Sequence, residues 1–313
     1  MKTIACTAAI ISTLCAVGPA HAQGFPSKTF TILVTTPAGG PVDSVARVWA
    51  DQLRKKSAES VVVENRAGGA GVLAMSALAA APADGHTLTL GGNQIQVLLV
   101  KDLGYDPAKV TPVSIVAQSS FTLTVSKQSN LRNYGELIAF AKANPGKLTV
   151  GFVPGVHELY SHAFEREVGI QSTLVPYKGT APLETALLAG EVNATLLSNY
   201  AKVQSGQLVG LATSADTRRP EIPDVPTFKE LKIGYEPHGL ITAWARSDTP
   251  AALLDRLNRE AVELARSPEF VATATRRFGL EPIGSTRELA VRQTSTELDT
   301  LKTVAERAGV RPQ

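Results

Sequence analysis

The sequence predicts an α/β protein with two lobes, each built on a sheet whose strands run mostly parallel. Short β-branched runs alternate with longer segments of helical period along most of the chain. This alternation is typical of parallel strands whose connecting helices pack on the faces of the sheet. The alternation occurs in two separate groups, and the 313-residue length is enough for two hydrophobic cores.

The two groups are divided at about residue 120, and a helical tail follows them. Apolar periodicity and β-branched runs place each expected element. The expected strands are residues 30–35, 61–64 and 148–153, with further runs near Thr173, Ala194 and Leu208, and the expected helices are residues 42–56, 72–81, 158–168, 251–265, 269–278 and 286–308.

The connection between the lobes is expected to be made by ordered strands. No low-complexity linker separates the two groups, and residues 111–126 form a β-rich run long enough to cross from one to the other. If residues 237–247 cross back, lobe 1 comprises residues 23–122 with 240–313, and lobe 2 comprises residues 123–239. This connectivity leaves a central cleft between the lobes.

The first 22 residues read as a secretory signal peptide. Lys2 precedes a short apolar stretch that ends in small residues at Ala20-His21-Ala22, and polar residues interrupt the stretch before it reaches membrane-spanning length. The only cysteines, Cys6 and Cys15, lie in this segment. Removal of the segment therefore leaves a chain without a thiol, stabilised by its core and free in its compartment.

Composition excludes several classes of function. The chain has 31 Lys and Arg residues against 28 Asp and Glu residues, with no long basic run, so nucleic acid is not an expected partner. His157 and His162 are five residues apart, do not share one helical face and are expected at the surface rather than on a metal. No nucleophile elbow or phosphate loop is present, so neither an enzyme nor a cofactor is expected.

The stretch "VTTPAGGPVDSVAR", residues 34–47, is the first candidate binding site. Gly39 and Gly40 join a strand to a helix that begins with Pro41, and glycines at such a turn let an anion reach the backbone amides. Pro37 and Ala38 complete the loop. The alternative is an ordinary Gly-Gly turn with no ligand.

Asp43 lies in the first turn of the same helix. A carboxylate there would repel a directly bound anion, so we expect Asp43 to order the loop or to act through water.

A second glycine cluster, "ENRAGGAGVLA", formally matches a dinucleotide-binding fingerprint through Gly69, Gly71 and Ala74. The match lacks its context, since Asn93 stands where an acid should bind the ribose. Dinucleotide binding is therefore disfavoured.

Motifs along almost the whole mature chain resemble the Bug (Bordetella uptake gene) family. They are "PAGGPVDSVAR", "VVVENRAGGAG", "PADGHTLTL", "YDPAKVTPVSIVA", "ANPGKLTVG", "VPYKGTAPLETALLAGEVN", "ADTRRPEIPDVPTFKEL" and "LLDRLN". Members of that family are periplasmic solute-binding components of tripartite tricarboxylate transporters. The resemblance implies a type II periplasmic binding protein fold, in which two α/β lobes close on a ligand in a central cleft.

The resemblance also implies that the ligand's carboxylate lies between two loops. Position by position, the first loop carries over to Pro37, Ala38, Gly39 and Gly40 with Asp43, and the second to residues 152–157, including Val153, Gly155 and His157. Tyr177, Lys178 and Gly179 fit a further family motif, although Lys178 could equally be a solvated lysine at the end of a strand. Asn93 and Asn199 are expected to line the cleft from opposite lobes.

Three departures from the family pattern concern the ligand. The second loop has lost most of its glycine and serine, Glu158 replaces a histidine, and Leu240 stands where a tryptophan is usual. Together with Phe152 and Val153, Leu240 favours an apolar or aromatic body behind the carboxylate.

The expected function is periplasmic capture of a carboxylate ligand, either a dicarboxylate or an aromatic carboxylate, by a monomer that delivers it to membrane permease subunits. A ligand-sensing partner of a membrane signalling protein and a secreted α/β hydrolase are the alternatives.

Overall fold

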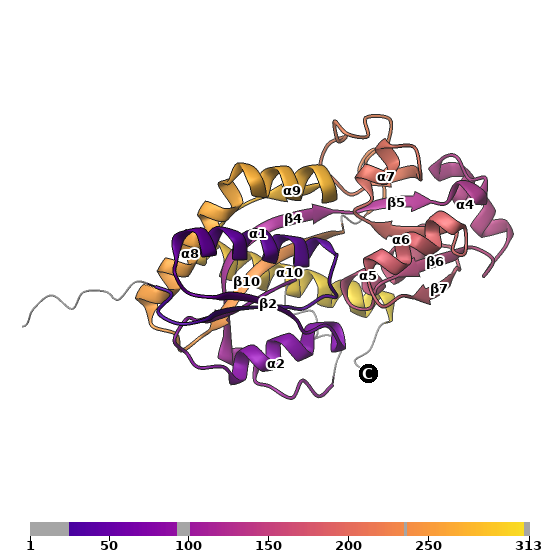
Figure 1. The fold of residues 1–313 in the computed structure, drawn as a ribbon. Helices are drawn as coiled ribbons and strands as arrows, with labels where there is room; N and C mark the ends of the chain where they lie inside the picture. Colours follow the sequence, from indigo (N-terminus) through magenta and orange to yellow (C-terminus); the bar gives the residue numbers. More distant parts are fainter. Residues whose placement is uncertain (1–24, 93–100, 235–236, 310–313) are drawn as a thin grey trace, which may run out of the picture.

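The computed structural model describes residues 25–92, 101–234 and 237–309, which form two α/β lobes side by side (Figure 1). The expected signal peptide, residues 1–22, and Asn93 lie outside the described residues. Each expected strand and helix is found within a few residues of its predicted bounds.

The sheet of the first lobe has six strands in the order β11-β4-β10-β3-β1-β2. Its strands are β1 (Phe30–Val34), β2 (Val61–Asn65), β3 (Thr87–Gly91), β4 (Val110–Ser120), β10 (His238–Arg246) and β11 (Leu280–Pro282). Strand β1 pairs in parallel with β2 and β3, whereas β10 runs antiparallel to both β3 and β4. The expectation of parallel sheets is therefore met only in part: β1, β2 and β3 pair in parallel, whereas β10 is antiparallel because the chain leaves the lobe along β4 and returns along β10 in the opposite direction.

Helices cover both faces of this sheet. They are α1 (Pro41–Lys56), α2 (Val72–Ala80), α8 (Ala251–Arg266) and α9 (Pro268–Phe278), with short 3₁₀ turns at Gly69–Gly71 and Pro107–Lys109. Trp49 of α1 and Phe270 of α9 lie in the main core, each at most 1% exposed. Met75 and Leu78 of α2 pack with Leu33 and Trp244 in a separate cluster.

The sheet of the second lobe has five strands in the order β7-β6-β8-β5-β9. Its strands are β5 (Thr122–Val125), β6 (Thr149–Phe152), β7 (Thr173–Pro176), β8 (Ala194–Leu197) and β9 (Val209–Thr213). Its helices are α4 (Tyr134–Ala143), α5 (Val156–Val168), α6 (Thr180–Ala189) and α7 (Tyr200–Gln204), with a 3₁₀ turn at Lys127–Ser129. The sequence did not single out α4 and α6, which are short and weakly amphipathic.

The two crossings between the lobes lie close together. A single residue, Phe121, separates β4 from β5, and its ring lies 5.6 Å from that of Tyr160. The hydroxyl of Tyr160 donates a 2.9 Å hydrogen bond to the carbonyl of His238, the first residue of β10. The outgoing and returning strands are thus tied by one side chain of α5.

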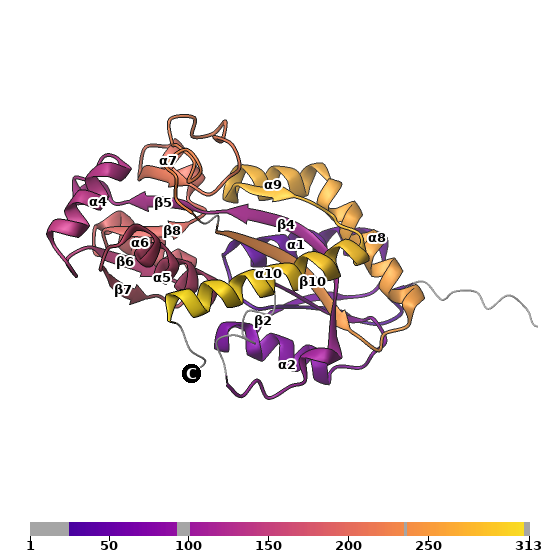
Figure 2. The ribbon, with the colours of Figure 1, turned by 180° about the vertical axis from the view of Figure 1, so that it is seen from behind.

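The last helix, α10 (Arg287–Ala308), contributes to both cores (Figure 2). Ala290 packs with Ile115 and Leu240 of the first sheet, whereas Leu301 and Ala305 lie in the main core of the second lobe. The division of residues 23–122 with 240–313 from residues 123–239 stays a prediction. The end of α10 packs against the second lobe through Leu301 and Ala305.

Candidate functional site

A cavity of about 310 Å³ lies between the two lobes. This volume is at the lower end of the range, about 300–1,000 Å³, that is typical of sites for small molecules. Its lining residues come from the β1–α1 loop, the end of α9, the first turns of α6 and the start of α7: Gly39, Gly40, Phe278, Thr180, Ala181, Glu184, Ser198, Asn199, Ala201 and Lys202.

Helices α1 and α6 begin at the wall of this cavity without a side-chain cap. Their N-cap residues, Gly40 and Gly179, provide no hydrogen bond from a side chain. By contrast, side chains of Asn133, Ser267 and Thr286 cap helices α4, α9 and α10, and none of these three residues lines the cavity. Uncapped first-turn amides and the positive end of the helix dipole together favour an anion at these two helix starts.

Asp43 stabilises the β1–α1 loop through hydrogen bonds to its carboxylate. Its carboxylate accepts hydrogen bonds from the Gly39 amide, from Nε and Nη2 of Arg47 and from Nδ2 of Asn65, each at 2.9 Å. Burial alone would raise the pKa of Asp43, which is 3% exposed, but the bonds from Arg47, Gly39 and Asn65 outweigh it and hold the pKa below its usual value. The carboxylate is therefore ionised and occupied by the loop.

The amide of Gly39 already donates to Asp43, but other backbone amides at the start of α1 remain available. Helix geometry provides no acceptor within the helix for the amides of Gly40, Val42 and Asp43, and Pro41 has no N–H. These amides are the candidate donors of the loop.

The β1–α1 loop meets the loop before α6 across the two lobes. A Cβ added to Gly179 would lie 3.3 Å from Cγ of Pro37. The backbone of Gly179 also has φ of +143°, a conformation that residues with a Cβ rarely adopt. Glycine at this position thus permits both the turn into α6 and the close approach of Pro37.

A second contact between the lobes lies at the start of α5. A Cβ on Gly155 would lie 3.8 Å from Cβ of Ala70, which belongs to the second glycine cluster and packs against the core of the second lobe. Gly155 is the N-cap of α5 and has φ of +114°, and no side chain caps this helix either.

His157 lies two residues after Gly155 and is partly buried, which corrects the expectation of a surface position. Its ring meets Phe121 edge to face, with 5.1 Å between the ring centroids. Burial lowers the pKa of His157 to about 4, so the imidazole is neutral at neutral pH. His162, on the same helix, lies 3.6 Å from Glu165 and has a more exposed side chain.

Of the predicted residues that the structure describes, Gly39, Gly40 and Asn199 line the cavity. The others do not line it themselves: Pro37, Ala38, Asp43, Val153, Gly155, His157, Tyr177, Lys178 and Gly179. Val153 and Tyr177 pack against the cluster under α6, because each follows the end of a strand on the face that α6 covers. Lys178 is exposed and forms no ion pair with the described residues, in agreement with a solvated lysine. Leu240 packs with Ile115 and Ala290 under α10.

Asn199 is at the cavity wall and is 2% exposed. Its Nδ2 donates a 3.1 Å hydrogen bond to Oγ1 of Thr124, and its Oδ1 has no partner among the described residues. Buried polar atoms without a partner are uncommon in proteins, so the amide of Asn199 is a candidate for further hydrogen bonding.

Sequence reasoning missed most of the second lobe's contribution to the wall. Thr180 and Ala181 directly follow Gly179, so the rule that marked the Gly-Gly loop also applied to them. Phe278, Ser198 and Lys202 carry no comparable local signal, since only the packing of α9 and α7 brings them to the cavity.

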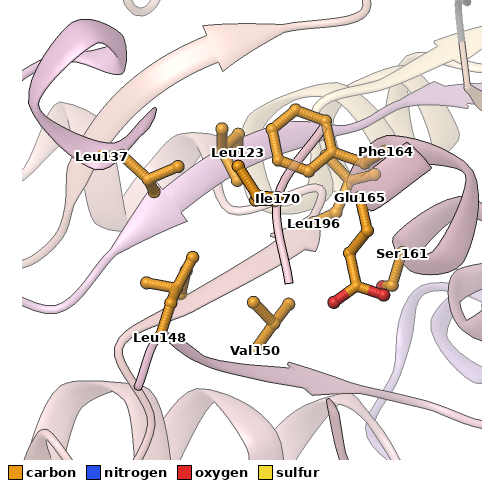
Figure 3. A pocket seen from close by; sticks show the side chains of 10 residues that line it. Leu123, Leu137, Leu148, Val150, Ser161, Phe164, Glu165, Ile170 and Leu196 are labelled. Carbon is orange, nitrogen blue, oxygen red and sulfur yellow. The ribbon is translucent and has the colours of Figure 1, made fainter. Parts of the chain in front are cut away.

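A second, much smaller cavity lies inside the core of the second lobe (Figure 3). Its volume is about 10 Å³, and apolar side chains such as Leu148 and Val150 surround it together with Ser161 and Glu165. The Glu165 carboxylate accepts hydrogen bonds from the amide and hydroxyl of Ser172. The space is about that of one water molecule, so it is a packing gap rather than a ligand site.

No group of three or more potential metal-ligating side chains occurs within residues 25–92, 101–234 and 237–309. In those same residues, no helix is both long and apolar enough to span a bilayer.

Comparisons with known proteins agree on one family. The family model described as "Tripartite tricarboxylate transporter family receptor" matches residues 45–309. A UPF0065 protein of Cupriavidus necator is 32% identical over 280 residues, which cover 84% of this chain and 83% of that protein. The protein BugT of Bordetella pertussis is 30% identical, with 86% of each chain covered.

Solved structures show the same two-lobed fold. R. palustris Rpa4515 with adipate has a TM-score of 0.85 and 30% identity, over 92% of this chain and all of that chain. The periplasmic binding protein BugD has a TM-score of 0.84 and 26% identity, over 92% of this chain and all of that chain. MatC from Rhodopseudomonas palustris with bound malate has a TM-score of 0.80 and 26% identity, over 90% of this chain and 99% of that chain. The predicted fold and the resemblance to the Bug family are confirmed.

Proposed function

Because the chain belongs to the family of tripartite tricarboxylate transporter receptors, whose members are substrate-binding proteins rather than enzymes, we propose that it captures a carboxylate-containing small molecule in the interlobe cavity. Delivery of this ligand to membrane permease subunits, by a monomer released into the periplasm after removal of residues 1–22, belongs to the same proposal.

One observation carries the proposal: two uncapped helix starts from different lobes meet at one cavity. Gly40 and Gly179 begin α1 and α6, and Pro37 of one loop lies against the backbone of the other. Each amide bond to a charged group contributes about 1.5–3 kcal/mol net, and a helix dipole adds about 0.3–1 kcal/mol. Three or four such contacts reach the roughly 8 kcal/mol of micromolar binding.

Asn199 adds a donor or an acceptor to this anion site. In the reverse amide orientation, Oδ1 accepts from the hydroxyl of Thr124 and the NH₂ group takes the unmatched position. Asn199 then offers a donor to a carboxylate.

The likeness to structures with adipate and malate favours an aliphatic acid. The expectation of an apolar or aromatic body behind the carboxylate rested on Phe152, Val153 and Leu240. Since Val153 and Leu240 pack away from the cavity, that expectation loses most of its support.

The test is a binding panel measured by thermal unfolding and calorimetry on the chain that starts at Gln23. Adipate, malate, succinate, citrate and benzoate are the ligands. At a hundredfold excess over its dissociation constant, a true ligand raises the free energy of unfolding by about 2.7 kcal/mol. The absence of a shift with every acid would refute capture of a carboxylate in this cavity.

The variant Gly40→Val tests whether the carboxylate binds at the β1–α1 loop. Gly40 has φ of −82° and ψ of 179°, which valine adopts readily, and an added Cβ would meet nothing closer than the Pro37 carbonyl at 3.9 Å. The fold should therefore be retained while the side chain blocks the first-turn amides, and carboxylate binding should be lost. Ala143→Val, at an exposed position of α4, is the control that retains affinity.

A further inference from the structure

Lys202 differs from the other lysines of the chain in its burial. Among the lysines that the structure describes, every other one is exposed, whereas Lys202 is partly buried. Lysine usually keeps its ammonium group in water, because moving the charge away from water is costly. A lysine that is partly buried at the wall of a cavity is therefore a candidate for binding an anion in that cavity.

No anionic partner of Lys202 is found among the described residues. Lys202 has no ion pair and no side-chain hydrogen bond with them, although its backbone amide and carbonyl are both bonded within the turn around α7. Surface lysines such as Lys28 and Lys56, in contrast, pair with acids at 2.7 Å and 2.6 Å. Within the described part of the chain, the lysine that most needs a counter-charge is thus without one.

The place of Lys202 connects it with the anion site. Asn199 and Lys202 are three residues apart at the start of α7, and the Lys202 amide donates to the Asn199 carbonyl at 3.1 Å. Both residues line the same cavity as Gly39 and Gly40 of the first lobe. One cavity therefore has backbone donors at the helix starts and an ammonium group on α7.

Glu184 is the other charged residue among those that line the cavity, and it is not free. It lies one turn along α6 from Thr180 and Ala181. Its charge disfavours a second anionic group beside α6 and leaves the α7 side, where Lys202 lies, for that group.

We propose that Lys202 binds a second acidic group of the ligand and so selects dicarboxylates over monocarboxylates of equal length. This inference rests on the proposed function, since it assumes that the first carboxylate lies at the helix starts. A charge-assisted hydrogen bond in a partly desolvated site changes affinity by about 10- to 100-fold.

The test uses matched ligand pairs and calorimetry. The pairs are the straight-chain dicarboxylates of four to eight carbons and the monocarboxylates of the same carbon number, including adipate with hexanoate. The variants are Lys202→Gln, which removes the charge, Lys202→Arg, which keeps it, and the control Lys142→Gln at an exposed position of α4.

The unaltered protein should bind at least one dicarboxylate about 10- to 100-fold more tightly than its monocarboxylate partner. Lys202→Gln should remove this preference by weakening the dicarboxylate only, Lys202→Arg should retain most of it, and Lys142→Gln should change nothing. The ratio of the two affinities separates a direct contact from a structural effect, because a damaged fold weakens both ligands equally.

Two results would overturn the inference. If the protein binds carboxylates but Lys202→Gln leaves the ratio unchanged, the proposed function stands and Lys202 has no role in selection. If the unaltered protein binds no member of either series but binds malate, citrate or benzoate, the inference fails and the proposed function stands; if it binds none of these acids, both fail.

Discussion

The carboxylate of Asp43 accepts a 2.9 Å hydrogen bond from the amide of Gly39, four residues before it in the chain. An acid at the start of a helix could compete with an anionic ligand for the same amides. Here, the acid binds the loop before the helix and is also held by Arg47 and Asn65. Asp43 thus fixes the conformation in which the following amides are presented.

Asp43→Asn should lower the free energy of unfolding by about 1–3 kcal/mol and weaken carboxylate binding, because Arg47 loses a buried charged partner and the loop loses its order. Urea unfolding and calorimetry measure the two effects. If repulsion of the ligand were the main effect of Asp43, the variant would bind more tightly. Asp51→Asn, on the exposed side of α1 and 2.6 Å from Arg54, is the matched control and should stay within about 0.5 kcal/mol of the unaltered protein.

Gly179→Ala should reduce affinity by more than its effect on stability explains. The new Cβ would lie 3.3 Å from Pro37 of the other lobe, so the lobes could not approach as closely. Gly146→Ala is the control, since Gly146 also has positive φ, +75°, but faces open space. Both variants should lose about 1–2 kcal/mol of stability through backbone strain, and equal affinities in the two would disprove the role of the Pro37 contact.

The stability of the protein should fall as the pH drops from about 6.5 towards 4, in part because of His157. The pKa of its imidazole is lowered from 6.5 to about 4 in the folded state, so the unfolded chain binds the proton first and protonation favours unfolding throughout this window. The folded-state pKa values of Asp43 and Glu165 lie below the usual 3.8 and 4.5, so the stability that these groups add begins to be lost near those usual values and falls further at lower pH.

Thermal unfolding at pH 7, 6, 5 and 4 measures this dependence. His157→Gln should show a shallower loss of stability between pH 6.5 and 4 than the unaltered protein, and equal slopes would contradict the burial of the imidazole against Phe121.

Local pattern predicted the elements of the site better than their side-chain contacts. The stripe of apolar residues behind Pro41 predicted α1 almost to its ends, and the two glycines before it predicted the uncapped start that faces the cavity. Both features depend only on a few neighbouring residues, so they can be predicted from the local sequence.

Contacts that depend on distant segments could not be predicted in this way. The orientation of Tyr177 is set by α6, and the burial of His157 is set by Phe121 at the crossing. Lys202 reaches the cavity only because the strands before it pair in the order seen. The antiparallel pairing of β10 likewise requires a return crossing that no local pattern specifies.

The single residue between β4 and β5 also bears on how efficiently such a receptor can use its binding energy. A long flexible linker would allow many distances between the lobes, and ligand binding would then cost the conformational entropy of fixing one of them. Phe121 is the single residue between β4 and β5, so this connection has no flexible linker, and Phe121 is only 3% exposed. The two lobes are therefore held close together by the chain itself, so little chain entropy would be lost when the proposed ligand binds between them.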